Sequence, residues 1–141
     1  MIDNKIEINL KEFPKISYKP YYMTYIDAVV INIHTQVSSV ITHEFIFDTG
    51  AAITILNAKF AYLFEDTDTP VITYQHIQYG GNVVKLPIYE INIVIKGQLF
   101  KLPAAFDKDM KLTSLLGHLG FLNELEHYWV SKKRRKLTII T

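Results

Sequence analysis

The chain has 141 residues, of which 49% are apolar and 21% charged, so it can form one domain with its own core and is too apolar to be disordered. Its net charge of +1 provides no overall field that would attract nucleic acid or an anionic membrane. It contains no cysteine, which excludes disulfides, thiol catalysis and cysteine-bound metals.

The first 26 residues mix charged and apolar side chains and include Pro14 and Pro20. They lack the continuous apolar run of a signal peptide, and no later run approaches the roughly 18 apolar residues of a membrane span. We therefore expect residues 1–26 to form an arm packed on a domain that covers 27–141. We also expect a cytoplasmic protein with no membrane partner.

Two-residue alternation with many β-branched and aromatic residues predicts strands along most of the chain. A segment at 53–64 begins as a strand and ends as a short helix, with Asn57 placed to cap the helix. Gly80 and Gly81 form a tight hairpin turn between two strands. The predicted strands are 25–36, 43–49, 71–79, 82–95 and 99–106.

The C-terminal part has one helical pattern, at 117–126, where Leu119, Leu122 and Leu125 recur at helical spacing. A hairpin follows, with its turn in the basic run 132–136. Many short strands and a single short C-terminal helix predict an all-β fold, closed into a barrel or stacked as a sandwich.

One acid, Asp48, interrupts an apolar stretch, EFIFDTGAAITIL, at residues 44–56. A strand leads into it, Gly50 permits a tight turn, and a second strand begins directly afterwards. Thr49 is positioned to fix the loop by a hydrogen bond, and the small Ala51 leaves room for another chain. The pattern predicts a carboxylate at the tip of a loop anchored in the core.

A single carboxylate is a poor catalyst of hydrolysis. Two facing carboxylates share one proton, so that one of them can act as a base and the other as an acid. One activates water as a general base, and the other protonates the substrate carbonyl as a general acid. The sequence holds only one such acid motif. A symmetric homodimer is the simplest arrangement that supplies the second Asp48.

The stretch FIFDTGAAITIL, at 45–56, resembles the active-site segment of the retropepsin-like aspartic proteases: Asp-Thr/Ser-Gly-Ala in an apolar frame, followed by Thr after two variable residues. A second stretch, SLLGHLGFLNEL at 114–125, resembles the apolar-apolar-Gly segment near that family's C-terminus. Residues 76–106 resemble its flap hairpin and the strands that follow. The matched positions are Asp48, Thr49, Gly50, Ala51, Thr54, Leu115, Leu116 and Gly117.

The resemblance, which covers about residues 27–141, implies a small closed β-barrel that assembles as a C2 homodimer. It implies an aspartic endopeptidase that acts on a peptide or protein substrate without a metal or other cofactor. Flaps would close over an extended peptide. The implied catalytic residues are Asp48, Thr49 and Gly50, and the implied substrate-binding residues are Ala51, Ala52, Tyr79, Gly80 and Gly81.

The sequence departs from that family at two positions. Ala52 replaces a residue that is usually acidic or Ser and that contacts the substrate backbone. His118 replaces an Arg that often supports the dimer by ion pairing, so the dimer could respond to pH. These departures leave open an alternative: a catalytically silent dimer of the same fold that binds an extended peptide or a partner strand.

The sequence signals for nucleic-acid binding and for metal binding are weaker than the signal for an aspartic protease. The basic run 132–136 has no interleaved aromatic residues and is interpreted as a solvated turn, so no nucleic-acid partner is expected. The five histidines lack the close pairing of zinc ligands. The acids of the polar loop at 65–68 are interpreted as solvated, so no metal site is expected.

Overall fold

The structure is a computed structural model that describes residues 4–12 and 22–141. Pro14 and Pro20 of the expected arm lie outside the described residues. The elements are β1 (Lys5–Asn9), β2 (Lys11–Glu12), β3 (Tyr22–Met23), β4 (Tyr25–Asn32), β5 (His43–Phe47), β6 (Thr54–Leu56), η1 (Ala58–Phe60), α1 (Ala61–Phe64), β7 (Thr73–Tyr79), β8 (Asn82–Ile95), β9 (Gln98–Phe106), β10 (Ser114–Leu116), η2 (Leu122–Glu124), β11 (His127–Ser131) and β12 (Lys136–Ile140).

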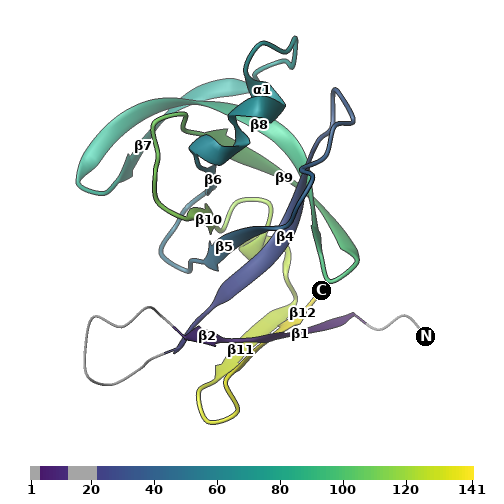
Figure 1. The fold of residues 1–141 in the computed structure, drawn as a ribbon. Helices are drawn as coiled ribbons and strands as arrows, with labels where there is room; N and C mark the ends of the chain where they lie inside the picture. Colours follow the sequence, from purple (N-terminus) through teal and green to yellow (C-terminus); the bar gives the residue numbers. More distant parts are fainter. Residues whose placement is uncertain (1–3, 13–21) are drawn as a thin grey trace.

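Six strands close into a barrel in the order β4-β5-β10-β6-β9-β8, and an antiparallel pairing of β8 with β4 completes the ring (Figure 1). β7 is added outside the ring, as the partner of β8 in a hairpin. This arrangement confirms the predicted closed β-barrel, and the hairpin turns at Gly80 and Gly81, where the sequence predicts it.

The long strand β8 belongs to the hairpin in its first half and to the barrel in its second half. Opposite faces of the strand are buried in the two halves. Near the hairpin, Leu86 and Ile88 pack in a small cluster with Ile53 and Ile55. Farther on, the buried positions shift by one residue and enter the main barrel core. The buried residues of this second half are Ile91, Ile93 and Ile95.

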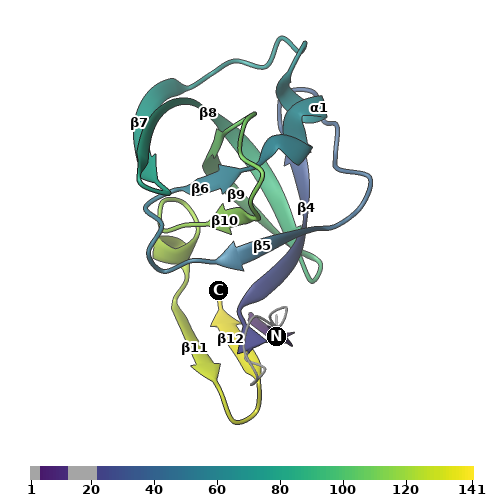
Figure 2. The ribbon, with the colours of Figure 1, turned by 60° about the vertical axis from the view of Figure 1, so that its left-hand side comes forward.

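A second sheet, in the order β1-β12-β11, lies beside the barrel (Figure 2). Ile6 and Ile8 of β1 are buried and belong to the main core. β4 begins at Tyr25, before the expected end of the arm at residue 26. The division of the chain into an arm and a domain at this residue stays a prediction.

The sequence predicts two short helices, and the structure has a 3₁₀ turn at the start of the first and only a 3₁₀ turn at the second. Asn57 caps η1 as predicted, since its side-chain oxygen accepts a hydrogen bond from the Lys59 N–H at 3.1 Å. The predicted C-terminal helix is only a 3₁₀ turn, η2, because Gly120 has a φ of +74° before it and Leu125 is extended after it. Within the described ranges, no helix is long and apolar enough to span a membrane.

His43 is expected to make the folded state less stable in acid. Its ring lies 4.4 Å from the Phe60 ring, its Nε2 is buried without a hydrogen-bond partner, and burial together with the nearby Lys59 lowers its pKa below 6.5. As the pH falls through about 6.5, the His43 ring is therefore protonated in the unfolded chain before it is protonated in the folded chain. This difference favours unfolding. In His43→Phe, the free energy of unfolding should fall less between about pH 7.5 and 5.5. The exposed His76→Phe variant is the control, and equal slopes in wild type and His43→Phe would contradict the assignment.

Candidate active site

The loop after β5 holds Asp48 in a tight turn. The Asp48 N–H donates to the Leu116 carbonyl at 3.0 Å, which continues the β5–β10 pairing into the loop. One carboxylate oxygen, Oδ1, accepts the Gly50 N–H at 2.8 Å, and the Asp48 carbonyl accepts the Ala51 N–H at 3.2 Å. The loop therefore fixes the carboxylate through its own backbone and through β10.

The backbone of Gly117, directly after β10, lies very close to the backbone of Ile53 at the end of the acid loop. A Cβ at this position would lie 2.4 Å from the Ile53 carbonyl carbon and 2.8 Å from the Ile53 nitrogen. The Gly117 N–H donates to the buried Thr54 Oγ1 at 3.1 Å. The apolar-apolar-Gly segment thus packs against the acid loop because only a glycine permits this backbone approach.

His118 ties the acid loop to the segment after β10 through two hydrogen bonds, one from its backbone and one from its ring. Its backbone N–H donates to the Ala51 carbonyl at 2.9 Å. On the ring, Nε2 lies 2.7 Å from the Thr49 carbonyl oxygen and Nδ1 lies 3.1 Å from Asn123 Oδ1. A carbonyl oxygen only accepts, so Nε2 carries a proton and donates to Thr49.

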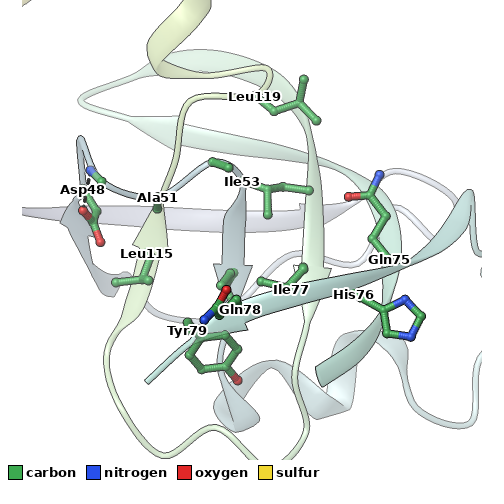
Figure 3. A pocket seen from close by; sticks show the side chains of 13 residues that line it. Asp48, Ala51, Ile53, Gln75, His76, Ile77, Gln78, Tyr79, Leu115 and Leu119 are labelled. Carbon is green, nitrogen blue, oxygen red and sulfur yellow. Dashed lines mark hydrogen bonds between the residues drawn. The ribbon is translucent and has the colours of Figure 1, made fainter. Parts of the chain in front are cut away.

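A cavity of about 560 Å³ opens between the acid loop and β7 (Figure 3). Asp48 lies at one end of it in this view and Gln75 and His76 lie at the other, with Ile53 and Ile77 between them. The lining residues are Asp48, Gly50, Ala51, Ala52, Ile53, Ile55, Gln75, His76, Ile77, Gln78, Tyr79, Leu115 and Leu119. Its wall is therefore mainly apolar, with one carboxylate and a polar rim on β7.

The predicted site residues are distributed unevenly around this cavity. Asp48, Gly50, Ala51, Ala52 and Tyr79 line it. The remaining predicted residues are not among its lining: Thr49 is exposed on the acid loop, and Gly80 and Gly81 form the β7–β8 turn, with φ of +58° and +80°.

The polar residues of β7 that face the cavity were not predicted from the sequence. Gln75, His76 and Gln78 line the cavity from this strand, which is an edge of the seven-stranded sheet. The only available signal was their place in the strand before Gly80, because alternation does not indicate which face of an exposed strand a cavity meets.

The cavity has a single acid. Asp48 is the one carboxylate among its lining residues, and no group of three potential metal-ligating side chains gathers within the described part of the chain. A two-carboxylate reaction at this cavity needs an acid from outside it.

Comparison of the structure with solved structures finds the same fold elsewhere. A retropepsin-like aspartic protease from Rickettsia conorii is 20% identical, aligns over 95% of this chain and 97% of its own, and has a TM-score of 0.58. The EIAV protease complexed with the inhibitor HBY-793 is 16% identical over 75% of this chain and 88% of its own, with a TM-score of 0.49. No family model and no curated protein sequence matches the chain. The chain thus has the retropepsin-like fold.

Proposed function

We propose that the protein is an aspartic endopeptidase whose active site is built by two copies of the chain, each of which supplies one Asp48. The observation that supports this most strongly is a carboxylate rigidly held at the mouth of an open, mainly apolar cavity that contains no other acid. The retropepsin-like fold is the second support.

In the proposed mechanism, the two Asp48 carboxylates face each other across a twofold axis and share one proton. The ionised carboxylate removes a proton from a water molecule, which attacks the peptide carbonyl, while the protonated one gives its proton to the carbonyl oxygen. The resulting tetrahedral diol collapses when the carboxyl that took the proton from water gives it to the amide nitrogen, which leaves as an amine, while one hydroxyl returns its proton to the other carboxylate. Gly50 holds each carboxylate in place, since its N–H donates to Asp48 Oδ1, and Thr49 supports the loop through its carbonyl, which accepts from the His118 ring.

The proposed substrate is an extended peptide that lies between the acid loop and β7. β7 is a sheet edge, so its outer backbone groups are suited to pair with a peptide strand. Ala51 and Ala52 form the opposite side with small side chains that leave the backbone accessible. Tyr79, Gly80 and Gly81 form the end of the hairpin, which acts as a flap over the peptide.

The direct test is cleavage of a mixed peptide library at about pH 4 to 7.5, a range that spans the proton-sharing states of such pairs. The mass of the native species is recorded in parallel. We expect cleavage by the dimer, next to apolar side chains that fit the wall formed by Ile53, Ile55 and Leu115. A confirmed dimer that binds these peptides and leaves them intact would contradict the proposal. It would support the second candidate, a silent peptide-binding dimer, which the absence of a polar side chain at Ala52 favours.

His118 should position the acid loop for this reaction. In His118→Ala the Thr49 carbonyl loses its ring donor, so the carboxylates lose alignment and kcat should fall about 10- to 100-fold with little change in KM. His118→Gln offers an N–H donor of similar reach and should restore most of the activity. A rise in KM at constant kcat in His118→Ala would contradict a positioning role.

A further inference from the structure

Gln75 lies near the start of β7 (Thr73–Tyr79) and lines the cavity at the end far from Asp48 (Figure 3). Its side chain is exposed and makes no hydrogen bond or ion pair with the residues that the structure describes. The amide of a glutamine carries one acceptor oxygen and two donor hydrogens. All of these groups are available to a molecule that enters the cavity.

Strand pairing places Gln75 on the inner face of the hairpin. Gln75 is paired with Leu86 of β8, and Ile77 is paired with Val84. Residues directly opposite each other in an antiparallel pair share a face of the sheet. Leu86 is buried, and Ile77 and Val84 pack against the same apolar cluster. The face that carries Gln75 is therefore the one turned toward the cavity.

His76, the next residue of β7, belongs to the opposite face, where it is paired with Lys85. Figure 3 shows the His76 ring turned away from the amide of Gln75. The one acid of the lining, Asp48, lies at the other end of the cavity, and the lining includes no Lys or Arg among the described residues. The inner face beside Gln75 thus presents a neutral amide without a counter-ion.

The side chains around this amide on the inner face are apolar. Leu86 lies opposite Gln75, and Ile77 lies two residues along the strand. A peptide that fills the cavity would exclude water from the amide. An apolar side chain at this point would leave the amide without a hydrogen-bond partner, which costs free energy. Sites that are built to hydrogen-bond a ligand reject analogues that lack the polar group.

We propose that Gln75 selects substrates that carry an uncharged hydrogen-bonding side chain, an amide in preference, at a position remote from the cleaved bond. This inference rests on the proposed function, because it assigns the substrate of the same site. A second amide is the best match, since its oxygen accepts from Gln75 while its N–H donates to Gln75. A charged substrate side chain would lose its hydration here and gain no counter-ion.

The length of β7 indicates which substrate residue meets Gln75. Tyr79 and Gln75 share a face and are four residues apart, which corresponds to about 13 Å along a strand. In Figure 3, β7 runs away from Asp48 as it passes from Tyr79 to Gln75. An extended peptide has the same rise per residue, so the selected side chain lies about three or four positions from the cleaved bond. A twofold-symmetric dimer repeats this subsite on the other side of the bond.

Paired peptides test the preference. Each pair has apolar residues on both sides of the cleaved bond and differs only by Gln or Met, side chains of similar length, at one position that is moved along the peptide. Wild-type kcat/KM should be about 10-fold higher for the Gln peptide at about three or four positions from the bond, and equal within the pairs at other positions. Equal values within every pair would overturn the proposal.

Gln75→Met should abolish or reverse this preference, because the variant side chain has no hydrogen-bonding amide. Gln78→Met is the matched control for selectivity: the same substitution in the same strand, on the face that His76 occupies. It should keep the wild-type ratio between the two peptides, whatever its overall rate. A Gln75→Met protein that keeps the wild-type ratio would contradict the assignment to Gln75.

Gln75→Glu adds the counter-ion that this end of the cavity lacks. Its preferred residue at the selected position should change from Gln to Lys, by about 10-fold in kcat/KM. A damaged protein cannot produce this gain of a new preference. A Gln75→Glu protein that cleaves and retains the wild-type order of preference would count against the proposal.

Peptide binding to Asp48→Asn separates this proposal from catalysis. Fluorescence anisotropy with the same peptides should give a Kd about 10-fold lower for the Gln peptide than for the Met peptide. This binding preference without any cleavage by wild type would support the role of Gln75 and contradict the endopeptidase. Cleavage by wild type without a preference would do the reverse, and a chain that binds none of the peptides would overturn both.

Discussion

Asp48→Asn is expected to lower kcat for peptide cleavage by about 10²- to 10⁴-fold, towards the upper end because one substitution removes both carboxylates of the dimer. Asparagine retains an oxygen that can accept the Gly50 N–H, which Asp48 Oδ1 accepts at 2.8 Å, so the turn should keep its shape. The amide can neither accept a proton from water nor supply one to the substrate. Single-turnover cleavage of a fluorogenic peptide measures the loss.

The fold and assembly of Asp48→Asn are checked by thermal unfolding and native mass, both of which should match wild type. Glu44→Gln is the matched control: this exposed acid lies on β5, the strand that leads into Asp48, and pairs with Lys11 at 2.9 Å. It should retain activity near that of wild type. An Asp48→Asn protein that cleaves at the wild-type rate would exclude the two-carboxylate mechanism.

Gly117→Ala is expected to have the largest effect on stability. The added Cβ would lie 2.4 Å from the Ile53 carbonyl carbon, and that neighbour is backbone rather than a movable side chain. Overpacking of this kind costs about 1–3 kcal/mol or more. Separation of the two segments would also lengthen the bond from the Gly117 N–H to Thr54 Oγ1. Urea unfolding measures the change.

Leu112→Ala is the control for Gly117→Ala. Leu112 lies before β10 and is 70% exposed, so its truncation should change the free energy of unfolding by less than about 0.5 kcal/mol. A Gly117→Ala protein as stable as wild type would mean that the close approach of β10 to the acid loop is not required by the fold.

Local sequence patterns predicted much of this fold because strand alternation and turn chemistry are local. The pair Gly80-Gly81 and the apolar alternation after it identified β8 with its observed bounds, 82–95. Asn57 was identified as a helix cap by its residue type and position. The closed barrel was predicted from the many short strands and from the family resemblance at Asp48 and Gly117.

Other features depend on contacts distant in sequence, which local patterns do not encode. The pairing of β1 with β12 joins opposite ends of the chain. The leucine spacing at 117–126 predicted a helix, but the positive φ of Gly120 and the packing of Phe121 in the barrel core leave only a 3₁₀ turn. The contact of His118 with Thr49 likewise becomes visible only when β10 is placed beside the acid loop.

Subunit mixing tests the central claim most directly. Wild-type and Asp48→Asn chains are unfolded together, refolded at fixed total concentration, and assayed against the fraction of wild type. If each site needs Asp48 from both chains, activity follows the square of that fraction, and an equal mixture retains about one quarter of the wild-type activity. Retention of about one half, in proportion to the wild-type chain, would mean that one chain forms a complete site and would contradict the account.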